Sequence, residues 1–328
     1  MPDPQTVLVT GGAGFIGSHL SDAFLAAGHR VVILDDLSSG KRRNVPESAE
    51  LHILDIRSSE AADLARRVGP DLLVHQAAQM DVRRSVADPV HDADVNLRGF
   101  LNLLEAAREC GTRRVLFAST GGAIYGEQDV HPAPEDHPAR PVSPYGVAKL
   151  AGERYLYYYH HEHGFDVTCL RYANVYGERQ NPHGEAGVVA IFLDRLLADE
   201  AVTINGDGMQ TRDYVHVSNV VEANLAAGRA SAQRLEAGEA DFRIYNVGTG
   251  VETSVVELYR ELAAAVGSDL EAAHGPAKPG EQRRSSVDAS RLRDELAMGE
   301  PLPLPEGFRR TADWFRRRAA ERRESGGE

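Results

Sequence analysis

Tyr145 and Lys149 are the two side chains of this sequence whose types and spacing best suit proton transfer. Four residues apart in a helix, a phenol and an ammonium lie on one face, one turn from each other. The ammonium favours the phenolate, so we expect it to lower the tyrosine pKa from about 10 toward neutral pH. Tyr145 could then act as a general base toward a substrate hydroxyl. Ser143 and Pro144, just before the pair, predict a helix N-cap and a first-turn proline.

A glycine-rich segment near the start of the chain strengthens this interpretation, because Tyr-x-x-x-Lys alone also occurs between solvated helix neighbours. An apolar run is followed at once by glycines spaced G-x-x-G-x-x-G and then by an amphipathic segment. This order of strand, glycine turn and helix predicts a dinucleotide site rather than a turn without a ligand. Gly11 would permit the tight turn, Gly14 the approach of backbone to pyrophosphate, and Gly17 the packing of helix on strand. Free N–H groups at the helix start, near Phe15 and Ile16, would meet the anion.

Two acids end the next apolar run, 30–34, and indicate which dinucleotide binds. Asp35 and Asp36 suit hydrogen bonds to adenosine ribose hydroxyls, whereas they would repel a 2′-phosphate. Arg42 and Arg43 could in principle bind that phosphate, but they begin seven residues after Asp35. The sequence therefore favours NAD over NADP. The turn that follows is predicted to line the cofactor site with Leu37, Ser38, Ser39 and Gly40.

Small and polar residues follow three further predicted strands, at the edge where open α/β sheets bind ligands. The third strand ends near Asp55 and Ile56, where Asp55 could meet the adenine. The fifth strand ends in Ser119 and Thr120, which could be simple caps, but their position before the Tyr–Lys pair favours a catalytic hydroxyl. The fourth, 72–75, runs into residues that would let backbone approach the cofactor: Gln76, Ala77, Ala78 and Gln79.

The order of these motifs resembles the extended short-chain dehydrogenase/reductase family, and within it the UDP-glucose 4-epimerase branch. The glycine spacing matches, and Asp35, Asn96, Thr120, Tyr145 and Lys149 follow in the family's order. The later matching segments are L-R-Y-A-N-V-Y-G (170–177), G-D-G-M-Q-T-R-D-Y-V-H-V (206–217), N-V-G-T-G (246–250) and P-G-E (279–281). The resemblance covers nearly the whole chain. It implies NAD as cofactor, with Asn96, Ser119, Tyr172 and Ala173 among its contacts.

The same resemblance implies an α/β fold: a Rossmann-type doubly wound parallel sheet with a smaller, interleaved C-terminal substrate lobe. Strand–helix alternation holds to about residue 176, and a segment rich in Gly, Asn, Pro and His then breaks it. Residues 1–176 with about 214–247 would form the NAD-binding domain. Residues 177–213 and 248–328 would form the nucleotide-sugar-binding lobe, with the substrate cleft between the two.

The mechanism that the resemblance implies is epimerisation of a UDP-hexose at C4, with NAD bound throughout. Tyr145 would take the proton of the sugar 4-hydroxyl while hydride leaves C4 for the nicotinamide, and Thr120 would hold the same hydroxyl. Lys149 would lower the Tyr145 pKa and bind the nicotinamide ribose. The 4-keto intermediate would then turn over and regain hydride on its other face. Counting back from Tyr125, the family's catalytic hydroxyl would fall on Gly121, whereas counting forward from Phe117 it falls on Thr120. A one-residue insertion in the Gly121–Gly122 pair reconciles the two counts, and we expect the hydroxyl at Thr120.

The UDP moiety is expected to meet residues of the second lobe. Asn174 would bind a phosphate, and Arg212 would pair with the diphosphate. The family usually has an arginine at the position of Lys278. A lysine keeps the positive charge but lacks the planar guanidinium that binds a phosphate in a bidentate way. Ser285 matches the position that lines the sugar pocket near C2, where a small residue admits 2-acetamido sugars; otherwise it is a solvent-facing loop serine. The remaining expected contacts are Gly187, Val188, Thr203, Asn205 and Glu281.

Three rival functions remain beside the epimerase. A nucleotide-sugar dehydratase of the same fold would carry an Asp-Glu pair after the strand-five hydroxyl, where this chain has Gly121 and Gly122. A UDP-uronate epimerase or decarboxylase is less well excluded. A non-catalytic NAD-sensing protein would typically lack the Tyr–Lys pair.

Composition restricts partners and location. The net charge of −13 argues against nucleic acid, and no apolar run approaches a membrane span, so we expect a cytoplasmic protein. His160, His161 and His163 fall at the polar end of a Tyr-rich helix, and we expect no metal site. The family leads us to expect a homodimer through helices near 97–110 and 145–160.

Overall fold

A computed structural model describes residues 4–182, 187–278 and 282–324, and its centre is a seven-stranded parallel sheet. The strand order is β10-β6-β5-β4-β1-β2-β3, so the direction of winding reverses between β1 and β4. Parallel sheets with such a reversal bind ligands at the carboxyl ends of the strands beside it. The predicted Rossmann-type fold class is confirmed. The strands are β1 (Thr6–Thr10), β2 (Arg30–Asp35), β3 (Glu50–Ile53), β4 (Leu72–His75), β5 (Arg114–Thr120), β6 (Asp166–Tyr172) and β10 (Phe242–Val247).

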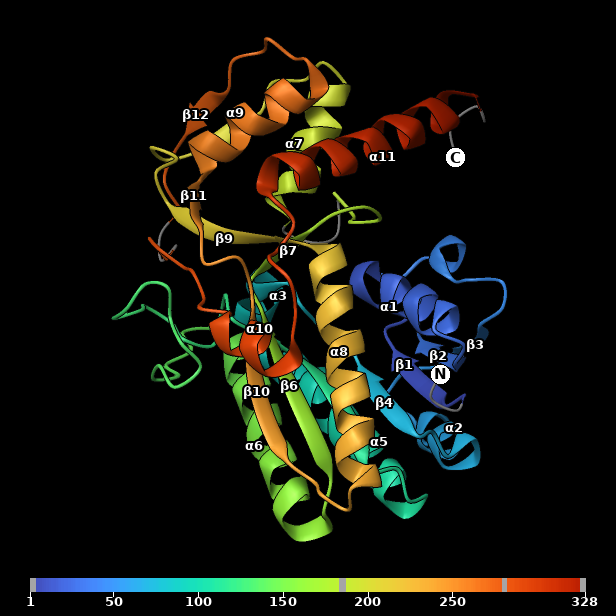
Figure 1. Cartoon of the computed structure of the whole chain (residues 1–328). Helices are drawn as coiled ribbons and strands as arrows, with labels where there is room; N and C mark the ends of the chain where they lie inside the picture. The colour runs from blue at the N-terminus through green and yellow to red at the C-terminus, as the bar shows by residue number, and fades with distance from the viewer. Residues whose placement is uncertain (1–3, 183–186, 279–281, 325–328) are drawn as a thin grey trace.

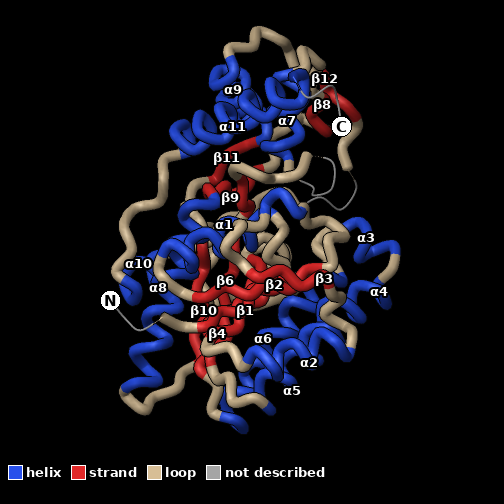
Figure 2. The backbone as a smooth tube through the Cα atoms, turned by 90° about the vertical axis from the view of Figure 1, so that its right-hand side faces the viewer, coloured by secondary structure: helices blue, strands red, loops and turns tan. Residues whose placement is uncertain are grey.

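Helices cover both faces of this sheet because successive strand residues point to opposite sides. In β1, Val7 and Val9 pack in one core with α1 and α8, whereas Leu8 packs in the core of the other face. Figure 1 shows α8 beside α1 in front of the sheet, and Figure 2 shows α2, α5 and α6 on its other side. These helices are α1 (Phe15–Ala26), α2 (Ser59–Val68), α5 (Phe100–Glu109), α6 (Pro144–His163) and α8 (Val217–Glu236).

A run of short helices joins β4 to α5 and reaches the helix that carries Tyr145. It consists of α3 (Val82–Ala87), α4 (Pro89–Ala93) and the π-helix η2 (Asp94–Gly99). Asp88 caps α4 by accepting a 3.0 Å hydrogen bond from His91 N, and Pro89 occupies the first turn. All three helices contact α6, so their side chains approach its first turns.

A smaller lobe lies beyond the carboxyl ends of the central strands (Figure 1). It holds a three-stranded sheet, β11-β9-β7, and a two-stranded sheet, β12-β8, around a core that includes Leu193, Leu258 and Phe308. No helix among the described residues is both long and apolar enough to span a bilayer. The elements are β7 (Asn174–Tyr176), α7 (Val188–Leu197), β8 (Thr203–Asn205), β9 (Thr211–His216), β11 (Glu252–Ser254), α9 (Val255–Val266), β12 (Ala273–Gly275) and α11 (Leu304–Glu324), while α10 (Ser290–Leu296) contacts α8 and β10.

Candidate active site

The glycine loop between β1 and α1 is shaped for a bound anion. Gly11 has a φ of 67°, and a Cβ there would lie 2.8 Å from Ala77 N. A Cβ on Gly17 would lie 2.1 Å from Gly11 O, so neither position accepts a side chain. Helix α1 begins at Phe15, directly after Gly14, with no acidic residue in its first turn. The first-turn N–H groups and the helix dipole therefore suit the pyrophosphate of a dinucleotide.

Asp35 and Asp36 have different environments. Asp35 is buried, and its carboxylate oxygens accept the Ala13 and Leu37 N–H groups at 2.9 and 2.8 Å. Burial raises the pKa of Asp35 above its ordinary value, and these hydrogen bonds oppose the rise. Each oxygen keeps a second lone pair for a ribose hydroxyl. Asp36 is exposed and accepts from the N–H and hydroxyl of Ser38, so the geometry favours Asp35 as the ribose acceptor.

The residues after β3 and β4 lie at the same edge of the sheet, but their side chains are already engaged. Asp55 forms an ion pair with Arg57, with 2.5 Å between Oδ2 and Nη2. The Asp55 carboxylate is 34% exposed, and contact with an adenine remains a prediction. Gln76 donates to the hydroxyl of Tyr172 at 3.1 Å, which ties the loop after β4 to the end of β6.

Gln79 and Asn96 form a buried cluster with Asp92. The Gln79 N–H donates to Asn96 Oδ1, and Asn96 Nδ2 donates to Gln79 O, each at 2.9 Å. Both side-chain amides also donate to Asp92 Oδ1, at 2.9 and 3.0 Å. The cluster holds the loop after β4 against η2. Sequence reasoning missed Asp92, because one acid in a polar stretch carries no pattern that separates it from a solvated residue.

Thr120 is the last residue of β5, and its surroundings distinguish it from Gly121. A Cβ on Gly121 would lie 2.8 Å from Val287 Cγ1 and 3.2 Å from Arg171 O, so that position cannot hold a hydroxyl without a rearrangement. A Cβ on Gly122 would lie 4.0 Å from Thr120 Oγ1 and 3.5 Å from Asn174 Oδ1. Thr120 and Asn174 therefore border the same small space. This arrangement favours Thr120 as the hydroxyl at this strand end.

Ser119, by contrast, directs its hydroxyl into the protein. Its Oγ donates to the carboxylate of Glu153 at 2.6 Å, and Glu153 forms a buried ion pair with Arg171. The Ser119 hydroxyl is thus engaged in this network, and the expectation of a catalytic hydroxyl rests on Thr120. The sequence offered one unused signal for the ion pair, an acid four residues after Lys149 on the same helix face.

Tyr145 and Lys149 lie one turn apart on α6, and the predicted N-cap is confirmed because Ser143 Oγ accepts the Gly146 N–H at 3.2 Å. Lys149 is buried, and its Nζ donates to Ala118 O at 2.8 Å. The same Nζ lies 5.8 Å from the centroid of the Tyr145 ring. Burial lowers the pKa of Lys149 from 10.5 to about 8.

The structure corrects the expected pKa of Tyr145. Burial raises this pKa well above its ordinary value, and the negative charge of Asp92 adds to the rise. The expectation that Lys149 lowers it toward neutral pH is wrong, because burial disfavours the phenolate. Ionisation of Tyr145 therefore requires further positive charge in the assembled site.

The predicted substrate residues lie mainly on the smaller lobe. Thr203 and Asn205 are the two ends of β8, and Arg212 lies in β9, where its Nη1 donates to Thr211 O at 2.7 Å. Gly187 is the N-cap of α7, and Val188 is its first residue. Lys278 is exposed, and Glu281 lies outside the described residues.

Ser285 is buried, which contradicts the solvent-facing alternative for this residue. Two residues further on, Val287 lies 2.8 Å from where a Cβ of Gly121 would stand and 2.5 Å from that of Gly248. The segment around Ser285 therefore passes close to the carboxyl ends of β5 and β10. Sequence alignment alone could not decide this, because the serine stands in a loop without periodicity.

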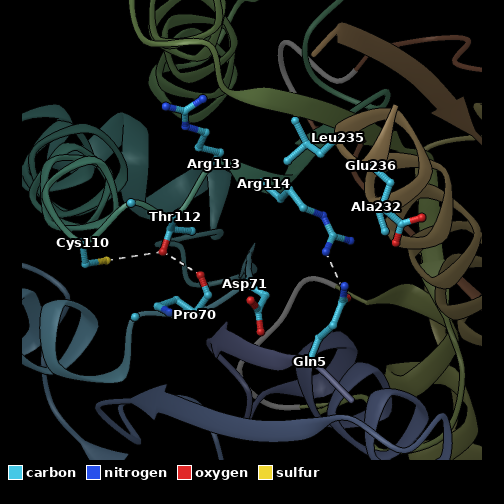
Figure 3. A pocket seen from close by; sticks show the side chains of 12 residues that line it. Gln5, Pro70, Asp71, Cys110, Thr112, Arg113, Arg114, Ala232, Leu235 and Glu236 are labelled. Atoms are coloured by element: carbon cyan, nitrogen blue, oxygen red, sulfur yellow. Dashed lines mark hydrogen bonds between the residues drawn. The ribbon is translucent and has the colours of Figure 1, made fainter. Parts of the chain in front are cut away.

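A groove of about 510 Å³ lies at the opposite, amino-terminal edge of the sheet (Figure 3). Arg114 is satisfied there by Gln5 Oε1 at 3.0 Å and Ser231 Oγ at 3.1 Å. Thr112 donates to Pro70 O at 2.6 Å. These buried groups are satisfied within the protein and lie far from Tyr145, so we assign the groove no part in catalysis.

Comparison with known proteins agrees with this geometry. Residues 7–248 match the model of the NAD dependent epimerase/dehydratase family. A UDP-glucose 4-epimerase of Mycolicibacterium smegmatis is 45% identical over 319 residues, which cover 95% of this chain and 99% of that protein.

Two solved structures extend the similarity to the whole fold. A UDP-glucose 4-epimerase from Thermotoga maritima, solved with UDP-glucose, is 42% identical with a TM-score of 0.89, covering 96% of this chain and 99% of that one. A UDP-glucose 4-epimerase from Thermus thermophilus, solved with NAD, is 45% identical with a TM-score of 0.87, covering 95% and 99%. The glycine loop, the buried Asp35 and the Tyr145–Lys149 pair thus stand in a fold shared along nearly the full length of each relative. The chain belongs to the NAD dependent epimerase/dehydratase family.

Proposed function

We propose that this protein interconverts UDP-hexoses at C4, above all UDP-glucose and UDP-galactose, with NAD held throughout turnover. The observation that carries the proposal is the arrangement of Thr120 at the end of β5 and of Tyr145 and Lys149 on α6, in one fold with the dinucleotide loop. The test is to incubate the purified protein with UDP-galactose and to follow UDP-glucose by NMR, and then to run the reverse reaction. Absence of conversion in both directions would refute the proposal.

The residues of the chain divide the work at C4 between them. Tyr145, as phenolate, would take the proton of the 4-hydroxyl and later return it, while the Thr120 hydroxyl would hold the same oxygen. Lys149 would supply positive charge beside the phenol and hold the nicotinamide ribose. A bound oxidised nicotinamide would supply the hydride acceptor at C4 and a further positive charge that favours the phenolate.

Epimerisation also requires that the keto sugar present both faces while its nucleotide stays in place. The smaller lobe offers charged and polar groups for the diphosphate: Asn174 on β7, Arg212 on β9 and Lys278 after β12. Holding the ligand by its nucleotide would leave the hexose free to rotate. Because the proton and the hydride both return to the sugar, net redox is zero.

The two residues after Thr120 argue against a dehydratase reaction. Such a reaction needs an extra acid after the strand-five hydroxyl to protonate a leaving group, and Gly121 and Gly122 occupy that place. The contact of Gly121 with Val287 leaves no room there for a carboxyl side chain. UDP-glucuronate, added to the substrate panel, tests the uronate epimerase and decarboxylase alternatives.

A second substrate class follows from Ser285. The residue is buried and small, in a segment that passes near the end of β5. We infer that the sugar pocket accepts a 2-acetamido group, so UDP-N-acetylglucosamine and UDP-N-acetylgalactosamine should also be interconverted. Absence of turnover on both acetamido sugars, with normal turnover of UDP-galactose, would refute this extension.

We further propose a cytoplasmic homodimer built on α6 and the α3–α4 run. Exposed apolar side chains gather on these contacting helices: Val82, Val86, Val90, Val147, Tyr155 and Tyr158. Such a surface suits a self-complementary interface. In this proposal the α3–α4 run takes the place of the helix near 97–110 that the family resemblance led us to expect, and it lies slightly before that helix in sequence. Light scattering of the purified protein tests the assembly.

A further inference from the structure

Asp92 is a deeply buried carboxylate with an incomplete set of partners. Its residue is 1% exposed, at the fourth position of α4. Oδ1 accepts the amides of Gln79 and Asn96, whereas Oδ2 is buried without a hydrogen-bond partner. Within the described part of the chain, no lysine, arginine or histidine forms an ion pair with it. Two neutral amides therefore donate to one oxygen, and no cation among the described residues forms a direct ion pair with the carboxylate.

Such an arrangement is costly, because a buried carboxylate normally has a cation or loses its charge. A group held in this way marks a functional site when ionisable partners lie near it. The helix packed against α4 is α6, and it presents Tyr145 and Lys149. The charge of Asp92 raises the pKa of both residues, which places all three in one electrostatic unit.

The other ionisable groups around Lys149 differ from Asp92 in their partners. Glu153, one turn along α6, also raises the Lys149 pKa, but it already forms a buried ion pair with Arg171. His75 on β4 is buried, and this burial lowers its pKa well below the ordinary value, so the imidazole is neutral. Asp81 and Asp94, near α3 and in η2, form ion pairs with arginines: Asp81 with Arg83, and Asp94 with Arg57 and Arg98. Asp92 is thus the carboxylate near Lys149 that has no ion pair of its own among the described residues.

We propose that Asp92 is a positioning residue for the proton-transfer pair: its carboxylate keeps Lys149 an ammonium inside the buried site, and its amide partners lock the loop after β4. The inference deepens the proposed function and rests on it for its catalytic meaning. The electrostatic part stands on the protein alone and can be measured without turnover.

The expected direction follows from charge. Removal of a negative charge favours loss of a proton, so the pKa values of both Lys149 and Tyr145 fall in an Asp92→Asn variant. The pKa of Lys149 lies at about 8, so its ammonium, and any activity that depends on that ammonium, is lost at lower pH in the variant. A purely structural role would lower activity at every pH and leave the pH at which it is lost unchanged.

The experiment uses the fact that the chain has three lysines, Lys41, Lys149 and Lys278. The NAD-loaded protein is labelled with lysine carrying ¹³C at Cε, and the Lys149 signal is assigned by its absence in Lys149→Met. In Asp92→Asn its titration midpoint should fall by roughly 1 to 2 pH units, as expected for loss of one nearby charge. The control is Asp88→Asn, at the N-cap of α4 one turn before Asp92, which keeps a capping side chain and should leave the midpoint and the activity unchanged.

Asp92→Ala carries the same prediction and replaces the asparagine variant should that one fail to fold. An unchanged Lys149 midpoint in either neutral variant overturns the proposal, whatever happens to the rate. A lowered midpoint, with activity lost at lower pH on the alkaline side, supports it. A lowered midpoint in a protein that turns over no UDP-sugar, native or variant, would support the electrostatic role and refute the proposed function separately.

Discussion

Arg171 and Glu153 form a bidentate ion pair beside the candidate active site, with 2.9 Å between Nε and Oε1 and 2.7 Å between Nη2 and Oε2. Their side chains are 3% and 1% exposed. The pair joins β6 to α6, and the Ser119 hydroxyl adds β5 to the same carboxylate. Thr120 is the next residue of β5, and Lys149 lies one turn before Glu153. β5 and α6, which carry the proposed proton chemistry, are therefore held to each other and to β6 by one buried charge network.

Glu153→Gln tests how much this network contributes to the stability of the fold. The change leaves the Arg171 charge buried without its partner, so the free energy of unfolding should fall by about 3–5 kcal/mol. The control is Glu109→Gln, whose ion pair with Arg66 is exposed, so its loss should lower the free energy of unfolding far less. Denaturant unfolding of both variants provides the comparison. Equal losses of unfolding free energy in the two variants would show that burial does not make the Glu153–Arg171 pair more stabilising than an exposed pair.

Tyr145→Phe should abolish turnover and leave the binding of NAD and UDP-sugar nearly intact, because only the proton acceptor is lost. Tyr155→Phe, at an exposed position of the same helix, is the matched control and should keep full activity. Steady-state rates and ligand titrations measure the two effects. More than about a tenth of native activity in Tyr145→Phe would contradict the role assigned to the phenol.

Asp35→Ala should weaken NAD binding by roughly 10- to 100-fold, since hydrogen bonds from the ribose to a charged acceptor are lost. The preference for NAD over NADP should also narrow, because the nearby negative charge is removed. Asp36→Ala is the control, since that exposed carboxylate binds Ser38. Calorimetric titration of each variant with NAD and with NADP measures both the affinity and the preference. A larger loss in Asp36→Ala would reverse the assignment.

Ser285→Tyr should suppress turnover of the 2-acetamido sugars by about tenfold or more and spare the plain hexoses, because overpacking typically costs 1–3 kcal/mol. Ser285→Ala, which keeps the small volume, should retain both activities. Rates on UDP-galactose and UDP-N-acetylgalactosamine are compared for each variant. Equal loss on both sugars, or none on either, would exclude Ser285 as the gate.

Contiguous features of this protein could be read from the sequence. The strand, the glycine turn and the helix start that form the dinucleotide loop follow one another within about ten residues of sequence. The Tyr145–Lys149 relationship depends only on the pitch of one helix, and Ser143 caps that helix as expected. The Rossmann-type fold class followed from alternation of apolar strands and helices together with the resemblance to a known family, whereas the strand order came from the structure. These properties are local, or repeat along the chain, so residue types and spacing suffice to predict them.

Other properties depended on which surfaces meet in the folded chain. The pKa of Tyr145 rises because burial removes water from the phenol, and no spacing within α6 reveals that burial. Asp92 approaches the pair from α4, Glu153 meets Arg171 across 18 residues of chain, and Val287 excludes a side chain at Gly121. Desolvation and charge compensation act through space, between segments far apart in sequence. Residue types along the chain therefore indicated which groups are candidates for the chemistry, whereas tertiary packing decided their burial, their pKa values and their partners.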